Sequence, residues 1–233
     1  MKTKPSSSFW LALGMVLFFA SQGLSAADRI VTAGDTNIHI TERVLQSAEV
    51  KYGPNARRRL VAWVNLITTN KNKSEAEKLK LANGFINRVP YMSDKENWGK
   101  NKYWATPVEM LASNGGDAED YAIGKYFTLL ALGVSMEHLH IAYVKAINRP
   151  PSEQAHMVLT YYSSPDSMPL VLDNFDPEIR SASERNDLLP VYTFNGDGLW
   201  LAKERSSGNS DDNVNMWNEM NARMGKELSA DDS

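Results

Sequence analysis

The hydrophobic pattern of this 233-residue chain changes its period near Gly133. Before Gly133, apolar residues recur at helical spacing behind helix-start signals, and after it short β-rich runs alternate with turn residues. The predicted helices cover residues 41–50, 55–67, a run from Ser74 that ends before Pro90, a short run from Thr106 and residues 118–132. The predicted strands cover residues 139–147, 156–162, 169–173, 190–194 and 199–203. Helices followed by strands predict an α+β domain with an antiparallel sheet.

Residues 1–27 have the pattern of a secretory signal. Lys2 and Lys4 form a positive end, residues 9–20 are apolar, and Ser25-Ala26-Ala27 offers small residues for cleavage. The apolar run is too short to anchor the chain across a bilayer. We therefore expect export to the periplasm, a folded domain over residues 28–205, and a polar C-terminal helix and tail over residues 206–233.

The composition excludes several classes of function. The chain contains no cysteine, so disulfides, thiolate metal sites and a lipid-anchored N-terminus are ruled out. A formal net charge of −3 provides no field that would hold nucleic acid or an anionic membrane. We expect no nucleic-acid partner and no direct membrane insertion after signal cleavage.

The segment from Asn114 to Ala122 is the most informative for chemistry. Gly115 and Gly116 permit a tight turn, and the residues after them form the first turn of a helix, whose free N–H groups carry partial positive charge. A nucleophile placed there would have its anion stabilised, as reactive thiolates are. Ala118, at the centre of this segment, has no reactive atom.

His156 and Asp173 lie on two strands that are expected to form a hairpin around the turn at residues 163–166. If facing residues keep a constant index sum of 329, His156 lies opposite Asp173. Facing side chains are close enough for a carboxylate to orient an imidazole, as in a nucleophile, base and orienting-acid site. A surface cross-strand pair accounts for the same spacing.

Asp117, Glu119 and Asp120 form an acidic group at the start of the same helix. Closely spaced carboxylates repel one another unless a cation or hydrogen-bond donors offset them, and oxygen ligands suit calcium. Acidic residues in a first helical turn also complement the helix dipole without any metal. The residues alone favour neither interpretation.

These residues resemble the bacterial transglutaminase-like cysteine protease family, and within it the LapG-type periplasmic proteases. The family motif Gly-Asp-Cys-Glu-Asp-Tyr-Ala matches residues 116–122 except at Ala118, and the segments around His156 and Asp173 match in order and type. The likeness covers the mature chain to about residue 205. It implies a papain/transglutaminase-like fold in which the helix at residue 118 packs on the antiparallel sheet.

The resemblance also implies roles for residues and partners. Position 118 would hold the nucleophile of a Cys-His-Asp triad, His156 would be its base and Asp173 would orient the imidazole. Asp117, Glu119 and Asp120 would bind calcium. The family cleaves the N-terminal region of a large LapA-type surface adhesin at a dialanine-containing site, which releases biofilm cells. The periplasmic domain of a LapD-type inner-membrane cyclic di-GMP receptor holds the protease inactive.

Ala118 lacks the sulfur atom that the family uses as its nucleophile, and a methyl group cannot attack a carbonyl. An engineered replacement of cysteine explains why the rest of the motif is intact, whereas the retained signal sequence favours a natural pseudoenzyme that binds adhesin or receptor. A transamidase or cell-wall amidase of the same fold is a further alternative. As written, the chain is expected to be inactive.

Overall fold

The computed structural model describes residues 38–147, 154–196, 198–201 and 210–228, so the predicted signal at residues 1–27 lies outside the described residues. Helices and strands follow each other in the predicted order. Of the helices in the described ranges, none is long and apolar enough to cross a bilayer. The α-helices are α2 (Glu42–Tyr52), α3 (Pro54–Asn70), α4 (Glu75–Ile86), α5 (Asp94–Trp98), α6 (Pro107–Ser113), α7 (Ala118–Ala131) and α8 (Ser210–Leu228).

The helix starts are set by local capping. Thr41 caps α2, and Ser74 and Thr106 form the predicted capping boxes of α4 and α6 with the glutamates three residues later. The short helix α5 was not predicted, although Ser93 and Glu96 form a capping box at its start. The sequence therefore contains the capping signal of α5, but a helix of five residues is too short to show a hydrophobic period.

The strands form a six-stranded sheet in the order β4-β3-β2-β1-β5-β6, and all of its paired neighbours are antiparallel. The two-residue strand β4 was not predicted, because two residues carry no readable alternation. The strands are β1 (Leu139–Ala146), β2 (Gln154–Tyr161), β3 (Leu170–Leu172), β4 (Arg180–Ser181), β5 (Leu188–Asn195) and β6 (Gly198–Leu201).

The hairpin of β2 and β3 forms, but its predicted register is wrong by two positions. Leu159 faces Leu172 and Thr160 faces Val171, so facing residues sum to 331 and not to 329. A shift of two keeps every side chain on its expected face, since the side-chain period of a strand is two. Asp173, just beyond the end of β3, is consequently a diagonal neighbour of His156 and does not face it directly.

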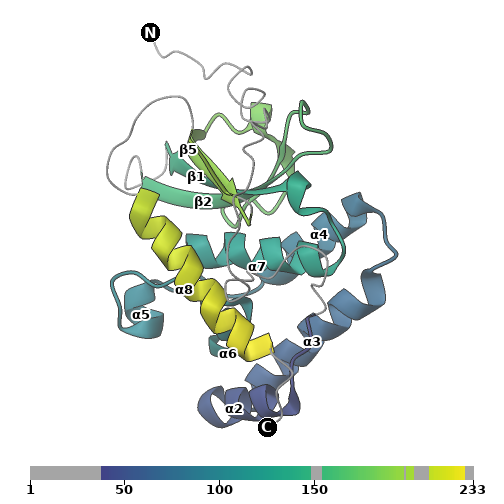
Figure 1. The fold of residues 1–233 in the computed structure, drawn as a ribbon, viewed down its shortest axis with the longest axis vertical. Helices are drawn as coiled ribbons and strands as arrows, with labels where there is room; N and C mark the ends of the chain where they lie inside the picture. Colours follow the sequence, from purple (N-terminus) through teal and green to yellow (C-terminus); the bar gives the residue numbers. More distant parts are fainter. Residues whose placement is uncertain (1–37, 148–153, 197, 202–209, 229–233) are drawn as a thin grey trace, which may run out of the picture.

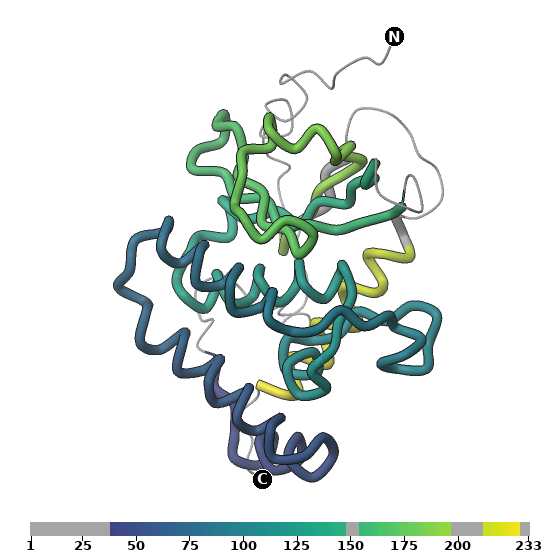
Figure 2. Tube along the Cα trace, turned by 180° about the vertical axis from the view of Figure 1, so that it is seen from behind, coloured from purple at the N-terminus to yellow at the C-terminus, as the bar shows by residue number. Residues whose placement is uncertain are grey.

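Helix α7 is the centre of the fold. It lies between the sheet and the remaining helices, with β1 and β2 on one side and α4 and α6 on the other (Figure 1). Nearly all of its residues are buried, which explains why its hydrophobic pattern is almost continuous. Seen from behind, α3 and α4 form a hairpin whose second helix runs beside α7 (Figure 2).

Helix α8 packs on the domain that precedes it. Its apolar face buries Trp217, Met220 and Met224 in the main core, and the Trp217 ring stacks on Phe127 with centroids 5.7 Å apart. Figure 1 shows α8 crossing over α7 toward α6. The C-terminal helix that was expected to be polar therefore has one apolar face, which packs on the domain.

Because Met220 is fully buried, Met220→Ala should lower the free energy of unfolding by about 2–5 kcal/mol through lost apolar contact and a cavity. Val214→Ala, on the exposed side of the same helix, should change it by less than about 0.5 kcal/mol. Urea unfolding of both variants checks this. Equal effects would mean that α8 does not pack stably on the domain.

Candidate active site

His156 and Asp173 form a buried pair at the sheet. The His156 Nε2 atom lies 2.7 Å from Asp173 Oδ1, and both side chains are completely excluded from solvent. The interpretation of a surface cross-strand pair is therefore wrong. The predicted contact forms despite the register shift, because side chains of this length reach a diagonal neighbour.

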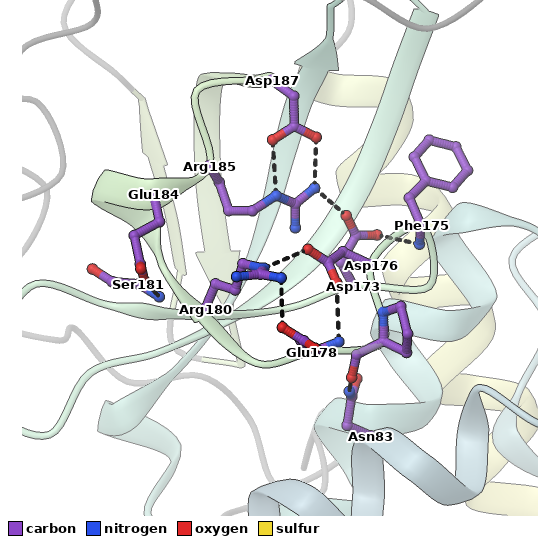
Figure 3. A network of polar contacts seen from close by, with 11 residues as sticks. Asn83, Asp173, Phe175, Asp176, Glu178, Arg180, Ser181, Glu184, Arg185 and Asp187 are labelled. Atoms are coloured by element: carbon purple, nitrogen blue, oxygen red, sulfur yellow. Dashed lines mark hydrogen bonds and ion pairs between the residues drawn. The ribbon is translucent and has the colours of Figure 1, made fainter.

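The Asp173 carboxylate is held by further donors (Figure 3). Its Oδ2 accepts a hydrogen bond of 2.7 Å from Arg185 Nη2, and its Oδ1 accepts one of 3.0 Å from the Phe175 backbone N–H. Arg185 is itself buried and is fixed by two hydrogen bonds to Asp187. The carboxylate thus has one orientation, which is set by His156 and by donors that lie on either side of β4.

Opposing effects act on the pKa of Asp173. Burial alone would raise it, but the hydrogen bond and charge of His156, with the Phe175 N–H and Arg185, outweigh burial and hold the pKa well below its usual value. Asp173 is therefore ionised at neutral pH. An ionised acceptor on Nε2 stabilises the tautomer of His156 that carries its proton there.

This arrangement leaves His156 Nδ1 as the basic nitrogen. The ring stacks on Phe175 with centroids 3.9 Å apart and planes within 5° of parallel, which fixes its plane. Nδ1 is buried and has no hydrogen-bond partner among the described residues. A neutral imidazole that donates through Nε2 can accept a proton at Nδ1, as a general base must.

The nucleophile position is the first residue of α7. Ala118 is buried, Asp117 is the N-cap residue, and α7 packs directly against β2, the strand of His156. A Cβ atom at Gly116 would lie 2.9 Å from Met110 Cε and 3.0 Å from Asp120 Cβ, so this turn requires glycine for space. The close approach that the Gly-Gly pattern predicted is therefore present, but the left-handed residue is Asn114, with φ 62°, and Gly116 is extended in a β-bridge with Tyr91.

Lys125 connects the same helix to the His-Asp pair. It lies seven residues after Ala118, on the same helical face, and is completely buried. Burial lowers the pKa of Lys125 to about 7, while the charge of Asp173 raises it and that of Arg185 lowers it. The Ala118 face of α7 is thus directed toward the side of the sheet where Asp173 lies.

An acidic cluster adjoins the start of α7. Asp94, Asp117 and Asp120 each offer a carboxylate oxygen, and these oxygens lie within 4.8 Å of one another. Two of the three were predicted metal ligands, whereas Asp94 was not. Glu119 lies outside this group of three but acts on Asp117 through its charge and a hydrogen bond.

The cluster fits a hard cation. Asp120 Oδ1 accepts the Ala105 N–H and Asp94 Oδ2 accepts the Tyr103 N–H, each at 2.7 Å. The other oxygen of Asp94 and the Oδ1 of Asp117 are buried without a hydrogen-bond partner among the described residues. Burial, followed by mutual repulsion with Glu119, raises the pKa of Asp117. A divalent cation would satisfy these oxygens and relieve the repulsion.

Sequence reasoning missed Asp94 and Arg185 because tertiary packing brings both to their sites: Asp94 begins the short helix α5, and Arg185 follows β4. Asp94 lies 23 positions before Asp117, and the loop 99–105 folds back so that its N–H groups bind Asp94 and Asp120. The capping box at Ser93 marked a helix start there, but nothing marked a ligand. Arg185 is an isolated arginine in a turn region, and no periodicity indicates that it is buried.

A buried His-Asp pair on an antiparallel sheet, packed against a helix that starts at the nucleophile position, defines the papain/transglutaminase-like class of α+β folds. The family model described as bacterial transglutaminase-like cysteine proteinase matches residues 61–193. This match spans more than half of the chain and includes α7 and the His-Asp pair. The chain therefore belongs to the bacterial transglutaminase-like cysteine proteinase family.

Solved structures agree with this assignment. Legionella pneumophila LapG is 40% identical with a TM-score of 0.68, covering 80% of this chain and 98% of that one. An EGTA-treated form gives 41% identity, the same TM-score and the same coverage. A calcium-bound form gives 41% identity and a TM-score of 0.66, covering 78% of this chain and 98% of that one. No curated protein sequence matches the chain.

Because Arg185 neutralises a buried carboxylate, Arg185→Met should lower the free energy of unfolding by about 3–5 kcal/mol. Arg180→Met removes an arginine that pairs with the partly exposed Asp176 and the exposed Glu178, and it should lower the free energy of unfolding much less, because solvent screens exposed pairs. Denaturant unfolding at neutral pH compares the two. Similar costs would contradict the role assigned to Arg185.

Proposed function

We propose that this chain has the scaffold of a periplasmic, calcium-dependent cysteine endopeptidase that cleaves the N-terminal region of a large surface adhesin and so releases biofilm cells. The observation that carries the proposal is the buried His156, whose Nε2 binds an ionised Asp173 while Nδ1 has no hydrogen-bond partner in the part of the chain that the structure describes. The 40% identity to LapG supports it. With Ala118 in the nucleophile position, the chain is an inactive form.

The roles follow for a chain with cysteine at position 118. His156 Nδ1 takes the thiol proton, and the thiolate attacks the scissile carbonyl to form a sulfur–carbon bond. Backbone N–H groups at the start of α7 stabilise the oxyanion, and the imidazolium gives its proton to the leaving amine as the carbon–nitrogen bond breaks. Water, deprotonated by His156, then hydrolyses the thioester. Asp173 orients the imidazole and stabilises its charged form.

Calcium is the proposed cation of the acidic cluster. Asp94, Asp117 and Asp120 would hold it, with Glu119 beside them. Bound calcium would supply positive charge that offsets the carboxylates at the start of α7. Since Asp94 belongs to α5 and not to α7, the cation would also hold residues 94–105 against the nucleophile position.

Control by a membrane receptor completes the proposal. The periplasmic domain of an inner-membrane cyclic di-GMP receptor would sequester this protein and keep it from the adhesin. Binding of receptor or adhesin does not need the thiol, so Ala118 also favours a second candidate, a natural pseudoenzyme that acts as a binding module. Separate measurements of binding and of cleavage distinguish the two.

Ala118→Cys should convert the inactive chain into an endopeptidase for an adhesin fragment with a dialanine site, because the base and its orienting acid are in place. Cleavage is followed by gel electrophoresis, with Ala118→Ser and the parent chain as matched controls that should remain inactive or nearly so. Adding His156→Gln to the cysteine form should abolish cleavage.

Two outcomes would contradict the endopeptidase proposal. A folded cysteine form that binds the fragment and leaves it intact would favour the binding module. Release of peptide from cell-wall fragments, or transfer of an added amine, without adhesin cleavage would favour an amidase or transamidase of the same fold.

Calcium should stabilise the parent chain, since it binds the folded cluster and not the dispersed residues. At a calcium concentration 100 times the Kd, the gain is about 2.7 kcal/mol, seen as a higher Tm in calcium than in EGTA. Asp94→Asn should reduce this shift, and Asp176→Asn, in a partly exposed ion pair, should not. The shift should shrink at acid pH because protons compete for the same oxygens. No shift at neutral pH would contradict the site.

A further inference from the structure

Tyr91 is an exposed aromatic residue beside the nucleophile position. Its exposed fraction is 61%, whereas the other aromatic side chains that the structure describes are half-buried or buried. It belongs to the segment between α4 and α5. A single exposed ring is ordinary on a protein surface, so its importance here depends on the backbone contacts that place it near Ala118.

The segment at Tyr91 is extended and is tied to the glycine turn. Tyr91 and Gly116 form an isolated parallel β-bridge, and the Met92 N–H donates to the Gly116 carbonyl at 2.9 Å. Met92 also packs on Gly115, where an added Cβ would lie 3.0 Å from Met92 Cβ and Sδ. Tyr91 is therefore held beside Gly116, which lies two residues before Ala118 in the sequence.

The polar backbone groups of Tyr91 point away from this contact. Successive residues of an extended chain direct their N–H and C=O groups to opposite edges, so the groups of Met92 face Gly116 and those of Tyr91 face outward. Among the described residues, the Tyr91 N–H and C=O make no hydrogen bond. They form a short, unpaired strand edge directly beside the nucleophile position.

The ring of Tyr91 lies on the side of the acidic residues. Partial burial and then the charges of Asp117 and Glu119 raise its pKa, so the phenol stands in the field of the first turn of α7. The backbone bridge to Gly116, two residues before Ala118, is the contact that places Tyr91 near the start of α7.

We propose that Tyr91 positions the substrate: its backbone N–H and C=O pair with an extended polypeptide segment, and its ring packs on a side chain of that segment. Strand addition of this kind recognises the peptide backbone and leaves sequence preference to neighbouring contacts. The occupant is the polypeptide whose scissile carbonyl would meet position 118. The inference rests on the proposed function, which it deepens by naming a docking element outside the triad.

The first test uses the parent chain, because Ala118 permits binding without turnover. A fluorescent peptide with a central Ala-Ala pair is titrated with the parent and its variants, and anisotropy gives the Kd. Tyr91→Ala should weaken binding about threefold to tenfold through loss of ring contact, and Tyr91→Phe should leave it unchanged. Val50→Ala, at an exposed apolar residue of α2, is the matched surface control. Thermal unfolding and the calcium shift check that each variant is folded.

The backbone contact is tested without altering the protein. Peptides N-methylated at one position at a time lose one donor, and one such position should weaken binding about fivefold in the parent and in Tyr91→Ala alike. In the Ala118→Cys form, Tyr91→Ala should raise KM by the same factor as Kd and leave kcat within about twofold, as loss of uniform binding does.

The outcomes separate this inference from the proposed function. If the Ala118→Cys form cleaves the peptide, and Tyr91→Ala changes neither the Kd of the parent chain nor the KM of the cysteine form, the inference is wrong and the endopeptidase proposal stands. If the cysteine form does not cleave the peptide, but the parent chain binds it and Tyr91→Ala weakens that binding, the endopeptidase proposal is wrong and the docking element stands. If the peptide neither binds nor is cleaved, both are wrong.

Discussion

The buried interaction of His156, Asp173 and Arg185 is the constraint on which the site depends. Two charged groups and an imidazole are removed from water, which is costly unless each finds its partners. Two segments between β3 and β5 provide them, because the Phe175 N–H, before β4, and Arg185, after β4, both donate to the carboxylate that the imidazole also contacts. The result is an imidazole with a fixed plane, a fixed tautomer and one free nitrogen. Everything proposed about catalysis depends on that nitrogen.

A second polar centre lies at the start of α7 and connects distant segments. Asp94 comes from the α5 region and Asp120 from α7, and both accept backbone N–H groups of the loop that ends at α6. The cluster joins the loop, the glycine turn and the nucleophile position into one unit, and its repulsion is offset when a cation is bound. The same turn holds the extended residue Tyr91 in its parallel bridge. Cation binding and substrate docking are therefore both expected to depend on the conformation of the segment that precedes α7.

Ala118 gives this scaffold a particular character. The surrounding residues retain the geometry that a thiolate would need: a helix start, a glycine turn and an oriented imidazole. An alanine there removes reactivity and adds no strain, since its methyl group is smaller than a thiol-bearing side chain. Under the proposed function, substrate binding and chemistry can therefore be measured separately in this chain.

The sequence by itself determined the class of fold, most helix starts and the three segments of the family motif, because capping, period and motif order are local properties. It also identified His156 and Asp173 as partners, although the register that it suggested was two positions off. The tertiary structure alone decided that this pair is buried, that Arg185 neutralises it and that Asp94 joins the acidic cluster. These contacts join residues on separate segments, and no local pattern specifies how distant segments pack.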